Sequence, residues 1–297
     1  MQEKPGSGMV APLKRTRRQP PTVRLRRLAS ELRRLREEAG LSQTEVAEKT
    51  DVNLATLHRI ETAKAKPQLR TLNALLDAYG VTGDRRAELV ALQKEAKQRG
   101  WIHGFEVDLP DKYSAYIGLE AEAREAINYE SLFIPGLLQT EDYARAVMRG
   151  VRPTITGDEI ETRIAARLHR QALLESETPL RLWAILDQAA LSRMVGDDAI
   201  MYDQLTHLAQ QAQRPHITVQ VIPFSAGAHP GMPGSFIVLK FDGDGPDVIH
   251  IDSMAGGLFL EKEADIRQYN DTCQHLRAMA LSPADTAALI ASLREDR

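Results

Sequence analysis

Apolar residues recur at intervals of three and four along the first hundred residues, which is the spacing of one buried helix face. Gly40 ends a first run, whose apolar positions are Leu25, Leu28, Leu32, Leu35 and Ala39. The same spacing predicts a helix between Pro67 and Gly80 and a further helix over about residues 83–98. Helices that each bury one stripe around a shared core form an all-α domain.

Residues 41–61 predict two more short helices, joined by a tight turn. Ser42, followed three residues later by Glu45, is a capping box that satisfies two free amides at a helix start. Asp51 occupies the turn, where the backbone is left-handed, a conformation that Asp tolerates better than most residues. Asn53 suits the N-cap of the second helix. This arrangement is typical of a helix-turn-helix, which inserts its second helix into the DNA major groove.

The second helix of this pair has two faces. Leu57 and Ile60 face inward, whereas the outer side and first turn carry Leu54, Ala55, Thr56, His58 and Arg59. Arginine binds guanine bidentately, and small apolar side chains contact thymine methyl groups. The candidate DNA-binding residues are therefore Gln43, Asn53, Leu54, Ala55, Thr56, His58, Arg59, Lys64 and Lys66.

Residues 23–80 resemble the lambda-repressor-like helix-turn-helix domain of xenobiotic-response-element (XRE) regulators. The segments that carry the resemblance are LRRLREEAGLSQTEVAEKT and VNLATLHRIETAKAKP. The resemblance implies that Gln43 contacts a DNA phosphate and that Arg36 pairs with Glu61 as a structural clamp. It also implies that bases face Leu54, Ala55, Thr56 and Arg59.

Two features depart from the pattern of that family. Asp51 stands where glycine is usual in the turn, and Leu54 and Ala55 are poorer hydrogen-bonding residues than many recognition residues. Direct readout is therefore expected to rest mainly on Arg59, with apolar contact to thymine methyl groups.

Charge divides the chain into a basic and an acidic part. Residues 1–100 hold 21 Lys and Arg against 12 Asp and Glu, a balance of +9, and residues 101–297 hold 17 against 29, a balance of −12. Positive charge gathered on one domain is the electrostatic footprint of nucleic-acid binding. The first 22 residues predict a disordered basic tail, either an arm that reaches the minor groove or an unstructured leader.

Length and composition set the remaining boundaries. No segment approaches the ~20 apolar residues of a membrane span, and no apolar core of a secretory signal follows the basic start. A single cysteine, Cys273, suits a reducing cytoplasm. Two domains are expected from 297 residues, with a packed connector containing Trp101 and Phe105. The predicted divisions are a tail at 1–22, a DNA-binding domain at 23–99, a connector at 100–112 and a second domain at 113–297.

The second domain alternates helical and extended patterns. Strands are expected at 126–133, 180–186, 217–222, 236–241 and 248–251. Helices are expected at 113–124, 140–148, 158–175, 188–194, 199–213, 261–279 and 283–294. These elements predict an α+β domain with a mixed or antiparallel sheet flanked by helices.

This half also resembles a known family. The motifs PGLLQTEDYARA, RLHRQALL and VIPFSAGAHPGMPGSF are similar to an uncharacterised C-terminal domain that follows helix-turn-helix domains in actinobacterial, antitoxin-like regulators. The resemblance spans roughly residues 105–290. It implies a regulator and a small partner protein encoded nearby, but no ligand and no reaction.

The second domain lacks the motifs of the common enzyme classes. It contains no HExxH, CxxC pair, GxxxxGK[ST], GxGxxG or GxSxG, and its histidines lack metal-ligand spacing. Asp242 and Asp244 fit a hairpin turn better than a calcium loop. Neither a catalytic residue, a metal nor a cofactor is therefore predicted.

Four further residues of this domain each allow two interpretations. Asp187, at a strand end, and His229, in a glycine-rich loop, are the candidates for a ligand pocket, although a strand-end Asp is commonly a helix N-cap and a loop histidine is usually solvated. Arg167 and Arg170 are expected to pair with acids at the surface or to line a partner surface.

The sequence thus predicts a cytoplasmic, homodimeric regulator that binds double-stranded operator DNA, with the second domain serving dimerisation and partner or ligand control. Two alternatives stay open for the second domain. One is an antitoxin-like interaction module that sequesters a small basic partner, and the other is a domain that senses or modifies a small molecule.

Overall fold

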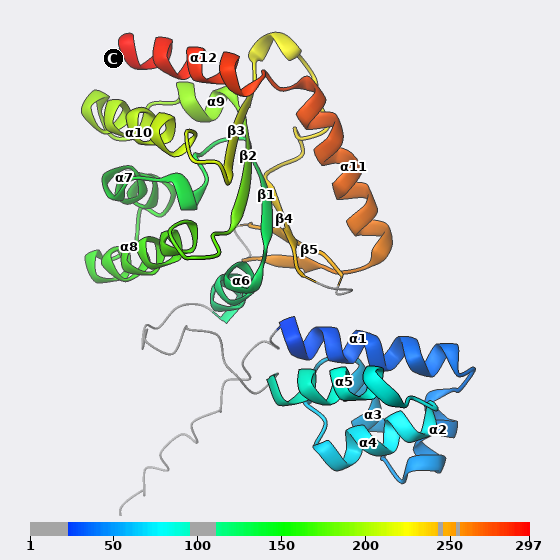
Figure 1. Ribbon diagram of the computed structural model, residues 1–297. Helices are drawn as coiled ribbons and strands as arrows, with labels where there is room; N and C mark the ends of the chain where they lie inside the picture. Colours follow the sequence, from blue (N-terminus) through cyan, green and yellow to red (C-terminus); the bar gives the residue numbers. More distant parts are fainter. Residues whose placement is uncertain (1–22, 96–110, 243–245, 254–255) are drawn as a thin grey trace, which may run out of the picture.

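The computed structural model describes residues 23–95, 111–242, 246–253 and 256–297. The predicted basic tail, most of the predicted connector with Trp101 and Phe105, and Asp244 of the hairpin turn lie outside these ranges. The N-terminal part consists of five helices (Figure 1), as the sequence predicts: α1 (Val23–Glu38), α2 (Gln43–Thr50), α3 (Leu54–Glu61), α4 (Leu69–Ala78) and α5 (Gly83–Glu95).

The five helices enclose one small core. Two leucines of the predicted stripe on α1, Leu28 and Leu32, are fully buried. They belong to the same hydrophobic cluster as the inner face of α3. The other members of the core come from α2, α3, α4, α5 and the loop after α4, and they are Val46, Leu57, Ile60, Leu72, Leu75, Leu76, Tyr79, Val81 and Leu89. Helix α3 is therefore held from beneath, and its outer face remains available.

The C-terminal part contains a six-stranded sheet and seven α-helices among the described residues. The helices are α6 (Asp111–Glu122), α7 (Glu141–Val151), α8 (Gly157–Gln171), α9 (Gln188–Ser192), α10 (Asp198–Gln211), α11 (Glu263–Met279) and α12 (Pro283–Glu295). Short 3-10 turns follow β1, α8 and β3: η2 (Gly136–Leu138), η3 (Ala172–Leu174) and η4 (Phe224–Ala226).

The sheet is mixed, which confirms the predicted fold class. Its strands are β1 (Glu125–Glu130), β2 (Arg181–Asp187), β3 (Ile217–Ile222), β4 (Phe236–Lys240), β5 (Val248–Ile251) and β6 (Leu258–Leu260). They lie in the order β3-β2-β1-β4-β5-β6. The first three strands run parallel, and each of the others is antiparallel to its neighbours. The sequence did not predict β6, because three residues are too short for a recognisable alternation.

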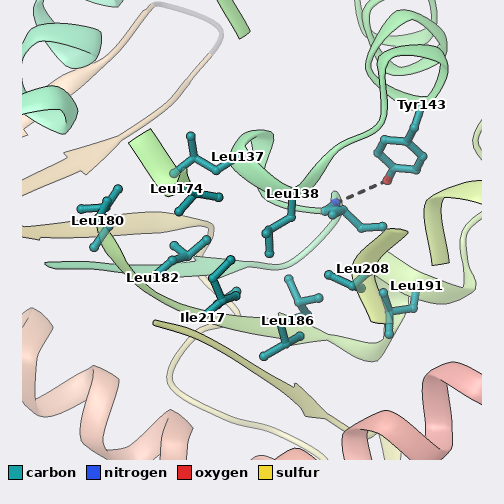
Figure 2. Packing of buried hydrophobic residues seen from close by; sticks show 14 of the residues in the cluster. Leu137, Leu138, Tyr143, Leu174, Leu180, Leu182, Leu186, Leu191, Leu208 and Ile217 are labelled. Carbon is teal, nitrogen blue, oxygen red and sulfur yellow. Dashed lines mark hydrogen bonds between the residues drawn. The ribbon is translucent and has the colours of Figure 1, made fainter. Parts of the chain in front are cut away.

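Helices cover both faces of this sheet. Helix α11 lies on one face (Figure 1), where Cys273 and Leu276 pack against a cluster that includes Ile127, Ile185 and Val238. On the other face, Figure 2 shows Leu182, Leu186 and Ile217 of β2 and β3 beneath leucines of η2, η3, α9 and α10. The carboxyl ends of the three parallel strands therefore open into loops at one edge of a well-packed layer.

Candidate nucleic-acid interface

The helix-turn-helix is capped as its sequence predicts. Ser42 Oγ accepts from Glu45 N at 3.2 Å, and Ser42 N donates to a Glu45 carboxylate oxygen at 2.8 Å, so the capping box is complete. Asp51 ends α2 in the left-handed region, with φ 55° and ψ 25°. Asn53 Oδ1 accepts from Ala55 N at 2.9 Å and starts α3. These local bonds define the starts of α2 and α3, and Asp51, not a glycine, occupies the left-handed position between them.

The two faces of α3 have opposite environments. Leu57 is fully buried, and Ile60 is only 1 % exposed. The exposed candidate residues are Asn53, Leu54, Ala55, Thr56, His58, Arg59 and Lys64, while Lys66 and Gln43 are partly buried. The guanidinium of Arg59 makes no hydrogen bond or ion pair with any described residue. It is therefore an uncommitted hydrogen-bond donor on the outer face of the motif.

The carboxylate of Glu61 joins three elements at the base of α3. Arg36 donates to both oxygens, from Nε at 2.8 Å and from Nη2 at 3.1 Å, and its Nη1 donates to the carbonyl of Leu41 at 2.8 Å. The Glu61 side chain is only 2 % exposed. Its hydrogen bond with Arg36 raises the pKa of that guanidinium. The clamp that the family resemblance implies is present, as a bidentate pair.

Gln43 belongs to the same network. Its amide nitrogen Nε2 donates to Glu61 at 2.7 Å, so the side chain at the start of α2 is oriented by the residue that ends α3. This bond could not be predicted from the sequence, because the two residues are separated by 18 positions and both have other plausible partners. A side chain held in this way is pre-oriented for whatever it contacts outside the domain.

Asp187 and His229 come together in the second domain. His229 Nε2 lies 3.1 Å from Asp187 Oδ2, and the other oxygen of Asp187 accepts from Ala189 N at 2.8 Å as the N-cap of α9. His229 Nδ1 accepts from Gly231 N at 3.3 Å, which makes Nε2 the protonated nitrogen. The His229 side chain is 4 % exposed, so this loop histidine is not solvated. The pair ties the loop after β3 to the end of β2, and the ligand pocket stays a prediction.

Arg170 differs from the surface pairing expected of it. It is buried, and its Nε and Nη2 donate to the two oxygens of Glu120 at 2.6 and 2.8 Å. Tyr116 donates to the same carboxylate and stacks on His250 with ring centroids 4.3 Å apart. Pairing across 50 residues joins α8 to α6, which a reading of either helix alone does not reveal.

Family models match both halves of the chain. A domain of unknown function, DUF5753, matches residues 113–292, which is more than half of the chain. The chain belongs to the DUF5753 family. A helix-turn-helix domain model matches residues 27–89 of this DUF5753 protein. Searches against curated proteins and against solved structures found no significant match.

The helix-turn-helix domain supports a DNA-binding regulator rather than an enzyme. Within the described residues, no helix is both long and apolar enough to cross a membrane. The same residues contain no group of three or more His, Cys, Asp and Glu side chains placed to hold a metal ion.

Proposed function

We propose that this DUF5753 protein is a sequence-specific transcriptional regulator of the XRE type that inserts α3 into the major groove of operator DNA. The observation that carries the proposal is the outer face of α3, where Arg59 is exposed and uncommitted while Leu57 and Ile60 anchor the opposite face. Such a face offers hydrogen-bond donors and small apolar groups to base edges.

The candidate residues contact different parts of the DNA in this proposal. Arg59 binds a guanine through O6 and N7, and Leu54 and Ala55 pack against thymine methyl groups. Gln43, oriented by Glu61, donates to a phosphate. Asn53, Thr56, His58, Lys64 and Lys66 complete the contact surface along the groove and the backbone. The +9 balance of residues 1–100 supplies the sequence-independent part of the affinity.

The proposed regulator acts as a homodimer in the cytoplasm. One recognition helix reads only a few base pairs, so a specific operator requires two half-sites about 34 Å apart along the DNA. In this proposal the second domain mediates dimerisation and responds to a partner or ligand. Operator half-sites related by a two-fold axis would reflect the symmetry of the dimer.

The test is genome-wide immunoprecipitation of DNA with the tagged chain and its Arg59→Ala variant. We expect shared peaks with a palindromic motif that the variant loses, together with a cost of about 1–3 kcal/mol in operator binding in vitro. Arg181→Ala removes the same charge from an exposed strand position of the second domain and serves as the control. Binding that Arg59→Ala weakens equally on every sequence would refute the base-reading role.

A second candidate function is the binding of a small partner protein, as in antitoxin-like regulators. A pocket of about 470 Å³ is lined by Ala189, Ser192, Arg193, Met194 and Phe224. Phe224 is 60 % exposed and Met194 48 %, and aromatic, Met and Arg residues are enriched in protein interfaces. Co-purification of a stoichiometric small protein that is lost in Phe224→Asp, but kept in Val151→Asp, would support this candidate. Retention in both variants would exclude this surface.

A further inference from the structure

Three arginines share one face of α8 but have different partners. Arg163, Arg167 and Arg170 follow one another at intervals of four and three residues, so their side chains project from successive turns. Arg170 is neutralised by its bidentate pair with Glu120. No carboxylate of the described residues lies within 4.0 Å of the guanidinium of Arg163 or Arg167. Among the residues that the structure describes, these two positive charges therefore have no salt-bridge partner, whereas Arg170 has one.

The Arg167 guanidinium is held in place by neutral groups. Its Nη1 donates to the side-chain oxygen of Gln139, and the phenol of Tyr113 interacts with it electrostatically. Its Nε is buried and has no hydrogen-bond partner. A Cβ built on Gly136 would lie 3.5 Å from this Nε, which shows how closely the guanidinium approaches the loop after β1. These contacts orient the group but do not compensate its charge.

Arg163 is even less satisfied. It is partly buried and makes no hydrogen bond or ion pair with any described residue. Burial lowers the pKa of both Arg163 and Arg167, because removing water disfavours the charged form. In contrast, hydrogen bonds to carboxylates raise the pKa of the paired Arg36 and Arg145. Buried charges in proteins normally have a partner, so these two call for one.

The potential around Tyr113 has the sign that such a partner needs. Tyr113 Oη accepts from Arg170 Nη1 at 3.0 Å. Burial by itself raises the pKa of this phenol, but the charges of Arg170 and Arg167 outweigh it, and the net effect lowers the pKa. The region between α6 and α8 therefore favours negative charge on an oxygen atom.

We propose that Arg163 and Arg167 bind the carboxylate or phosphate group of a small organic anion at the surface between α6 and α8. Planar guanidinium groups form short, charge-assisted hydrogen bonds with both kinds of oxyanion. Glu130 interacts electrostatically with Arg167, and Glu159 and Asp252 interact with Arg163, at more than ion-pair distance. These carboxyl groups suit a ligand that also carries a hydroxyl or amino group. A regulatory role for the site rests on the function proposed above, whereas anion binding itself does not.

The test is calorimetric titration and thermal unfolding of the full chain with inorganic phosphate and, separately, with acetate, against NaCl at equal ionic strength. We expect saturable binding of at least one anion and a rise in melting temperature beyond that in NaCl. The anion that binds more tightly identifies the preferred head group. Arg163→Gln and Arg167→Gln should each weaken binding tenfold or more, while Arg181→Gln, exposed on β2, should leave it unchanged.

A second readout separates a binding site from a structural role. Without added anion, Arg163→Gln should melt no lower than the wild-type chain, because it removes a partly desolvated cation that makes no ion pair with a described residue. Lower melting temperatures without anion, together with unchanged anion affinity, would overturn the proposal, as would the absence of saturable binding of either anion. Operator binding is measured independently, so a chain that binds anion but no DNA refutes only the proposed function.

Discussion

Glu61 has only 2 % of its side chain exposed. Its buried carboxylate is stabilised by hydrogen bonds from two side chains, Arg36 and Gln43. A buried carboxylate that loses its cationic partner retains the cost of desolvation without the compensating attraction. The same residue that ends the recognition helix is therefore the electrostatic anchor of the DNA-binding domain.

Arg36→Met is expected to destabilise the N-terminal domain by about 3–5 kcal/mol, because it leaves the Glu61 charge buried with only an amide donor. Arg33→Met is the matched control on the same helix. Arg33 pairs with Glu37 in an exposed i,i+4 arrangement, for which the cost is about 0.5 kcal/mol or less. Urea unfolding of both variants checks the difference, and equal costs would show that Glu61 is not buried in solution.

Glu130 makes stability depend on pH. Burial raises the pKa of this carboxyl to about 7, against 4.5 for an unperturbed Glu, although a hydrogen bond with Ser235 opposes the shift. A raised pKa means that the folded state binds the proton more tightly. The stabilisation by this proton is complete below about pH 4.5 and is lost as the pH rises through 7. Asp252, which raises the pKa, and Arg167, which lowers it, are the charged groups that act on Glu130.

Glu130→Gln is accordingly expected to stabilise the chain at about pH 8, by at most about 3 kcal/mol, and to change little at about pH 5. The upper bound assumes no screening by solvent, and Glu130 is only partly buried, so a smaller gain is expected. Thermal melts of the variant and the wild type across this pH range measure it. A difference that does not vary with pH would contradict the assigned pKa.

At the scale of elements, the turn between α2 and α3 has Asp51, and not glycine, in the left-handed region. Asp51→Ala should destabilise the domain by about 1 kcal/mol, because alanine pays the left-handed penalty without the polar side chain that eases it. Asp51→Gly should stay within about 0.5 kcal/mol of wild type, since its relaxed backbone offsets its greater freedom in the unfolded chain. Equilibrium unfolding decides, and an alanine variant as stable as the glycine variant would refute the explanation.

The helices and strands show which sequence signals are sufficient to locate an element. The start of α3 and the whole of β3 lie where the sequence predicts them, because Asn53 supplies a cap and Pro223 closes an apolar run. The three residues of β6 carry no such pattern. The parallel pairing of β1 with β2 was also open, because period and composition do not specify a strand's neighbour.

The candidate sites show which contacts cannot be predicted from the sequence alone. The outward face of α3 followed from helical spacing, since the same period that buries Leu57 exposes Arg59. The burial of Arg170 did not, because it depends on Glu120 in another helix. His229 was likewise ambiguous, since only the fold brings Asp187 within 3.1 Å. Local signals identify faces of elements, whereas partners across elements require the tertiary structure.

For the whole molecule, the proposed function predicts a steep dependence of DNA affinity on salt. Each phosphate neutralised by a Lys or Arg contributes about −0.9 to the slope of log affinity against log salt concentration. Lys64→Gln should therefore reduce the slope by about one without altering the preferred sequence. Lys262→Gln, exposed in the second domain, is the control, and filter binding at several salt concentrations measures both. An unchanged slope in Lys64→Gln would remove Lys64 from the interface.

The order of strands in the sheet has a consequence for how the chain folds during its synthesis on the ribosome. Helices α1–α5 contact one another within residues 23–95 and can fold as soon as they emerge. Strand β1 pairs on one side with β4, and Glu125 meets Lys240 only after more than a hundred further residues have been made. Until then the nascent chain presents an unpaired strand edge, which invites aggregation. Translation that halts before β4 would thus release a folded helix-turn-helix attached to an incomplete sheet, making this interval the vulnerable period of synthesis.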